Sequence, residues 1–220
     1  EGYLKGLLSK KQGMQKYLTE ALGAFFLVLA FGFTGEPLAI GLTLMALIYI
    51  GYSVSGAHFN PAVSFAFLVK GKLSLTHFFG YFISQFTGAL LASALIYFLS
   101  GSVFYLEPPA DTGFYEQGFI EVFLTGIFVM IMLIFTLSER FRKSNLIGFI
   151  AGLTFAGMLI IATPVSGGVL NPVLSLGTVL FDLIQGGNSY LHTLLYTLAP
   201  ISGGTIAALS YNFFTPNEEG

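Results

Sequence analysis

Six long stretches of this chain contain no charged residue, and they constrain its fold more than any other feature. Charged residues make up only 9% of the sequence and apolar residues 55%, whereas a soluble domain has about 25% charged residues. The sequence therefore predicts an all-α membrane protein and excludes a water-soluble domain. The uncharged stretches are residues 21–35, 37–69, 73–106, 122–138, 144–181 and 183–217.

These stretches predict six transmembrane helices and two shorter ones. A spanning helix needs roughly 20 mostly apolar residues. The stretches at 37–69 and 144–181 are too long for one span, and each is interrupted near its end by Gly and by Asn-Pro. Each should therefore hold one span and a re-entrant half-helix that follows Asn60 or Asn171. The expected spans are 17–35, 38–55, 76–99, 117–138, 146–164 and 190–213.

One motif occurs twice. Residues 54–64 and 165–175 share the pattern V-S-G-x-x-x-N-P-x-x-S, which indicates an inverted internal repeat. Because each half has three spans, the second half lies upside down relative to the first, and the motifs meet from opposite sides near mid-bilayer. The expected divisions are a single domain over 1–220, repeat one at about 17–99, a linker loop at 100–116 and repeat two at about 117–213.

The Asn-Pro pairs predict helix starts at this depth. Asn is a preferred N-cap, and Pro is favoured at the first helical position, where no backbone donor is needed. Helix N-termini also bring partial positive charge to this point. Non-helical backbone here must be buried in protein or line a water-filled cavity, so we expect a continuous passage beside amide groups that point into it. The turns comprise Asn60, Pro61 and Ala62, and Asn171, Pro172 and Val173.

Two intramembrane acids and one histidine are candidates for supporting these turns. Glu20 and Glu121 occupy matching places near the start of each half. A proton relay is one option for such acids, but their matched positions favour binding of free backbone N–H groups in each loop. We expect His58 to anchor the first loop by hydrogen bonds, with a pore-lining or gating role as the alternative. The carbonyls of residues 57–59 and 168–170 should form ladders of acceptors.

Charge placement predicts the orientation. Basic residues cluster before the first span, after the first Asn-Pro turn, and between the fourth and fifth spans, while the other connections carry acids. Because basic loops stay in the cytoplasm, both termini should be cytoplasmic. The basic residues are Lys5, Lys10, Lys11, Lys16, Lys70, Lys72, Arg140, Arg142 and Lys143.

Several motifs, in the same order, resemble the aquaporin and aquaglyceroporin family, also called the major intrinsic protein family. The run SGAHFNPAV at 55–63 is similar to its first signature loop, and YFISQFTGA at 81–89, APISGG at 199–204 and the two acids Glu20 and Glu121 agree. The resemblance covers roughly 17–213. It implies a homotetramer with one pore per protomer that passes small uncharged solutes passively.

The second motif departs from the family pattern, which usually reads Asn-Pro-Ala-Arg. This chain has Leu174 in place of the Arg. Aligned on the Asn-Pro turns, the resemblance places the selectivity filter at Ile40, Leu159, Gly168 and Leu174, with no polar side chain. Such a neck gives a passing water no replacement hydrogen bonds, and ion exclusion then rests on the helix ends. We expect glycerol-like or other small neutral solutes, with water and gases as further candidates. Ser175 stands where the glycerol-specific branch usually has Asp, which argues against a typical glycerol facilitator.

Other functions remain open. These are a water-selective channel, a secondary transporter, in which inverted repeats with broken helices also occur, and a non-conducting structural member of the family. An enzyme is disfavoured, because the sequence lacks a nucleophile–base pair, a phosphate-binding loop and metal-ligand spacing, and has no cysteine. We expect no cofactor, no metal and no nucleic-acid partner. The expected partners are small neutral solutes, water and the lipid bilayer, and the expected location is the plasma membrane.

Overall fold

The computed structural model describes residues 2–141 and 143–216, which form helices and no strands. Six of the helices are long and apolar enough to cross a membrane, and two shorter ones begin at the Asn-Pro turns, so the predicted fold class is confirmed. The helices are α1 (Gly2–Thr34), α2 (Pro37–Ser55), α3 (Pro61–Val69), α4 (Leu75–Ser100), α5 (Phe114–Leu137), α6 (Ile147–Ser166), α7 (Pro172–Ile184) and α8 (Tyr190–Phe214).

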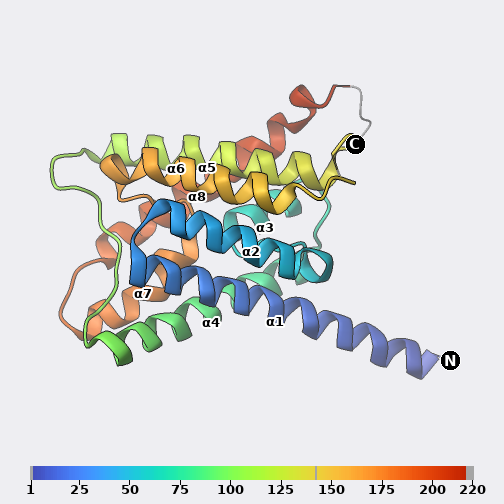
Figure 1. Ribbon diagram of the computed structural model, residues 1–220, viewed down its shortest axis with the longest axis horizontal. Helices are drawn as coiled ribbons and strands as arrows, with labels where there is room; N and C mark the ends of the chain where they lie inside the picture. The colour runs from blue at the N-terminus through green and yellow to red at the C-terminus, as the bar shows by residue number, and fades with distance from the viewer. Residues whose placement is uncertain (1, 142, 217–220) are drawn as a thin grey trace.

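Only one span bound differs by more than three residues from those expected. Helix α1 starts well before residue 17 and projects beyond the bundle (Figure 1), although its apolar span covers only Gln12–Thr34. Its first turns contain no proline and are rich in good helix formers such as Leu, Lys and Gln. Helix α6 continues past Pro164 to Ser166, where Gly167 takes a left-handed conformation and donates its N–H to the Thr163 carbonyl.

Small residues bring the first and third spans of each half together. Helix α1 packs closely on α4, and α5 packs in the same way on α8. A side chain at Gly88 would overlap the Ala21 carbonyl, and one at Gly203 would overlap the Val122 carbonyl. Because glycine lets two backbones approach this closely, both halves are built on the same type of contact.

The two half-helices lie inside the bundle and cross between halves. Helix α3 packs mainly on α8, whereas α7 packs on α4 and almost as extensively on α8. Four spans, α5, α6, α2 and α1, lie in that order across the molecule (Figure 1), and neighbours in the row contact one another. The half-helices thus pack against α4 and α8. The other four spans, α1, α2, α5 and α6, form a wall that faces the half-helices.

The start of α1 and the end of α8 lie at the same end of the molecule (Figure 1). Lys70 lies at this end too, because its Nζ donates to Asn212 Oδ1 at 3.0 Å. The Tyr17 hydroxyl is 2.9 Å from His77 Nδ1, which joins the middle of α1 to the first turn of α4. Lys70 therefore lies with the start of α1 and the end of α8.

Candidate functional site

Each re-entrant turn is capped by its own asparagine. Asn60 has an extended backbone, and its Oδ1 accepts a hydrogen bond from the Ala62 N–H at 2.8 Å. Asn171 has nearly the same conformation, and its Oδ1 accepts from the Val173 N–H at 3.3 Å. Each helix begins with the proline that follows. The side-chain oxygens are thus used for capping, which leaves the amide Nδ2 groups as donors.

These amide groups join the two halves. Asn60 Nδ2 donates to the Leu170 carbonyl at 2.9 Å, and Asn171 Nδ2 donates to the Phe59 carbonyl at 3.0 Å. Each amide therefore donates one N–H to the loop of the opposite half. The sequence predicted instead that these amide groups point into a passage. Two of the carbonyls expected to serve as free acceptors are occupied by the same bonds.

Glu20 holds the first loop. Its Oε1 accepts from Ser55 Oγ at 2.6 Å and from the His58 N–H at 2.9 Å. Its Oε2 accepts from the Phe59 N–H at 2.7 Å and from Gln85 Nε2 at 2.8 Å. The carboxyl group is fully buried, and hydrogen bonds to a buried acceptor offset its loss of water.

Glu121 holds the second loop with the same geometry. Its Oε1 accepts from Ser166 Oγ at 2.6 Å and from the Val169 N–H at 2.9 Å. Its Oε2 accepts from the Leu170 N–H at 2.7 Å. The structure therefore places both acids against the loop N–H groups rather than against each other, an arrangement that a proton relay between them would not need.

Two tyrosines complete the loop supports, and the sequence analysis did not single them out. The Tyr81 hydroxyl donates to the Ser55 carbonyl at 2.6 Å, and the Tyr196 hydroxyl donates to the Ser166 carbonyl. A signal was present, because in each half the tyrosine stands seven residues before the glycine that packs on the first span. These bonds fix the end of α2 and of α6 just before each turn.

His58 is held inside the first loop. Its Nδ1 lies 3.0 Å from Ser64 Oγ. Its ring packs against Phe67, with centroids 4.5 Å apart, and edge-on to Tyr81 at 5.2 Å. The side chain is buried, and these contacts tie the loop to the half-helix that follows it.

Three of the four expected filter positions line one small cavity. Ile40, Leu159 and Gly168 border a space of about 70 Å³, together with Thr163, whose hydroxyl is turned back to the Leu159 carbonyl at 2.7 Å. Leu174 is fully buried and does not border this cavity. The side chains of Ile40 and Leu159 are apolar and Gly168 has none, whereas Leu174 is outside the lining of this cavity.

A wide outer hollow of about 760 Å³ adjoins this cavity. Its lining is more polar and includes Glu107, Gln117 and His192. The hollow and the small cavity share four lining residues, so they form one mouth that narrows inward. The shared residues are Gly35, Leu106, Thr163 and Gly167.

The two asparagines lie deeper than the small cavity. Asn60 is 2% exposed and Asn171 is 0% exposed, and neither lines the small cavity or the outer hollow. Large buried apolar side chains form the core around them.

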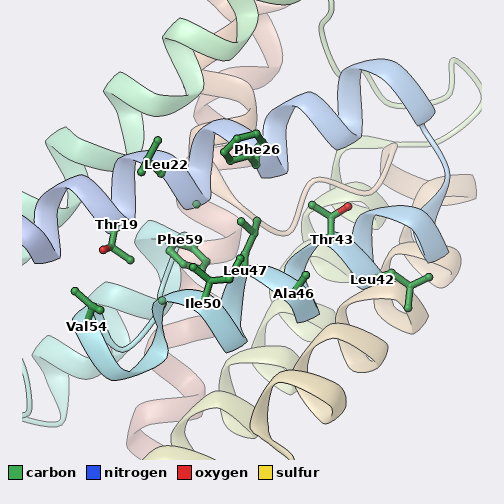
Figure 2. A pocket seen from close by; sticks show the side chains of 12 residues that line it. Thr19, Leu22, Phe26, Leu42, Thr43, Ala46, Leu47, Ile50, Val54 and Phe59 are labelled. Carbon is green, nitrogen blue, oxygen red and sulfur yellow. The ribbon is translucent and has the colours of Figure 1, made fainter.

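A separate apolar groove lies outside this mouth. It lies between α1 and α2, has a volume of about 710 Å³, and is lined by apolar side chains such as Leu22, Phe26 and Ile50 (Figure 2). Phe59 closes its floor, so the groove reaches the back of the first loop but not the Asn junction. Among residues 2–141 and 143–216, no group of three or more His, Asp or Glu could hold a metal ion.

Comparison with known proteins agrees with this architecture. A family model described as Major intrinsic protein matches residues 7–211. The chain is 35% identical over 210 residues to the glycerol uptake facilitator protein-like 6 of Lactiplantibacillus plantarum, covering 89% of this chain and 95% of that protein. It is 31% identical to Aquaporin NIP1-2 of Arabidopsis thaliana, covering 90% of this chain and 74% of that protein.

A solved structure shows the same fold. The aquaglyceroporin from Plasmodium falciparum matches with a TM-score of 0.76 and 23% sequence identity, covering 91% of this chain and 96% of that one. At this identity, the likeness concerns the arrangement of the helices.

Proposed function

Because this chain belongs to the major intrinsic protein family and is a membrane channel for small solutes, we propose that it passes small uncharged solutes passively, through an apolar outer constriction. Members of this family are channels rather than enzymes. The observation that carries the proposal is the junction at which Asn60 and Asn171 bring two helix N-termini together below a funnel-shaped mouth.

The junction favours neutral solutes over cations. The N-termini of α3 and α7 both begin at this point, and each carries partial positive charge. No charged side chain lines the small cavity above them, so an ion would lose its water there without a partner. In aquaporin-type pores an arginine can supply the barrier to cations. Here the two helix ends and the cost of dehydrating the ion supply that barrier.

The apolar walls favour solutes that need few hydrogen bonds. Ile40 and Leu159 present only hydrocarbon to the cavity, and Gly168 has no side chain. A water molecule would find few acceptors or donors there, whereas a solute with an apolar face is penalised less. A relative named as a glycerol uptake facilitator-like protein supports this solute class. Fast water flux with glycerol excluded would favour the alternative, a water-selective channel.

We extend the proposal to assembly and location. The start of α1, the end of α8 and Lys70 lie at one end of the bundle, which supports cytoplasmic termini. The plasma membrane is the location that we propose. A homotetramer with one pore per protomer is the expected assembly. Purified protein in detergent should then have a protein mass about four times the 23.7 kDa of one chain.

The filter is tested by adding the charge that position 174 lacks. Leu174→Arg should lower glycerol permeability about tenfold or more, as for an added barrier of about 1.4 kcal/mol. A charged side chain is costly to bury without a partner, so we expect the longer arginine to turn toward the nearby outer cavity and narrow it. Water and glycerol fluxes are measured by stopped-flow light scattering in proteoliposomes. Leu174→Met is the matched control, since it keeps the volume and adds no charge.

The outcomes separate the two parts of the proposal. Wild-type glycerol flux above that of protein-free liposomes supports the solute class. Unchanged selectivity in Leu174→Arg would show that position 174 is remote from the constriction. No flux of any neutral solute would reject conduction and favour a structural role for this member of the family.

A further inference from the structure

The small outer cavity is floored by large apolar side chains one helical turn deeper. Residues four apart share a helix face, so Leu44 lies below the cavity-lining Ile40 on α2. In the same way, Phe155 lies below Leu159 on α6. One such step is about 6 Å along the helix. Helix α2 starts at the mouth and α6 ends there, so both steps lead inward, toward the Asn junction.

Two more spans contribute to this floor. Phe31 of α1 lines the cavity, and its ring meets that of Phe155 with centroids 6.4 Å apart. On its other side, Phe155 meets Phe128 of α5, with centroids 4.8 Å apart and an interplanar angle of 55°. Leu27 lies one turn below Phe31 on α1. All four wall helices thus meet in one apolar layer.

This layer is tightly packed. Phe128 and Phe155 are each 1% exposed, and Leu27 and Leu44 are each 2% exposed. None of these side chains lines the small cavity. The layer therefore lies between the residues that line the cavity and the two buried asparagines.

We propose that Phe128 and Phe155 form an inner restriction that sets which solutes pass and how fast, in addition to the filter. The inference rests on the proposed channel function. The two phenylalanines are the largest members of the layer, and neither has a polar atom, so their contact is one of packing alone. A ring can turn aside without breaking a hydrogen bond. Conduction requires that movement, and a larger solute requires more of it.

The test replaces one of the two phenylalanine rings with a smaller apolar side chain. Phe155→Val should raise water and glycerol permeability per channel about five- to tenfold, the effect expected from removing one aromatic contact. Glycerol should gain more than water, so the glycerol-to-water ratio rises and the activation energy of flux falls. The matched control is Phe149→Val on the same helix, because Phe149 is 45% exposed on the outer surface.

A merely structural role would lower the yield of folded protein without changing the ratio or the activation energy. Phe128→Leu and Phe155→Leu, which keep most of the apolar volume, should show smaller changes in the same direction and replace Phe155→Val if it does not fold. Unchanged flux in all folded variants, alongside a conducting wild type, would overturn the inner restriction alone. No flux in the wild type and in every opened variant would instead overturn the channel proposal.

Discussion

At the scale of single residues, the loops hold backbone conformations that need outside support. Ala57, Phe59 and Leu170 have φ angles of 52°, 50° and 51°, in the left-handed region that side chains other than glycine disfavour. Glu20 and Glu121 bind the N–H groups of two of these residues directly. Each acid therefore acts as a fixed set of acceptors that holds a strained loop.

Removing one of these acids should destabilise the protein. Glu121→Gln replaces one acceptor oxygen with a donor and so breaks at least one hydrogen bond to a buried group. We expect a loss of about 1–3 kcal/mol, seen as a lower midpoint of thermal unfolding in detergent. Glu116→Gln, on the exposed first turn of the same helix, should leave the midpoint nearly unchanged. Equal midpoints for the two variants would contradict this role.

At the scale of helices, the paired glycine contacts set how closely the spans approach. Gly203→Ala would force a methyl group into the Val122 carbonyl and should cost about 1–3 kcal/mol by overpacking. The measurement is again the thermal midpoint. Gly157→Ala offers a matched helical control, since nothing lies within 4 Å of the added atom. That variant should be neutral or gain up to about 1 kcal/mol, and a drop as large as that of Gly203→Ala would argue against close packing.

The sequence was most informative where chemistry forces local structure. Uncharged stretches long enough to cross a bilayer predicted the spans, and Asn-Pro predicted the half-helix starts, because Asn60 and Asn171 satisfy backbone donors that would otherwise be orphaned. Matching spacing in the two halves placed Glu20 and Glu121 beside the loops. These inferences depend on neighbours in sequence or on symmetry.

Contacts between the two halves could not be predicted from residues that are neighbours in the sequence. Nothing in the sequence near Asn60 shows that its amide meets the Leu170 carbonyl, 110 residues away. The ring contact of Phe128 with Phe155 likewise depends on how two wall helices rotate against each other. For the same reason, the burial of Leu174 outside the lining of the cavity followed only from the packed structure.

At the scale of the whole molecule, the separation of charges predicts how the protein sits in its membrane. The chain has no cysteine, so single cysteines report sidedness without background. With both termini cytoplasmic, Asp111→Cys in intact cells should react with a membrane-impermeant maleimide, and Lys72→Cys should react only after the membrane is opened. Both positions are exposed. The reverse pattern would invert the orientation.

The reciprocal amide bonds also impose an order on biosynthesis. The Phe59 carbonyl receives its donor from a residue 112 positions later in the chain. A nascent first half, however well inserted, carries an Asn60 amide and a Phe59 carbonyl that lack these partners until the second half arrives. Such an intermediate should be retained by the insertion machinery, and a truncated gene should yield a product that is degraded rather than a half-sized pore.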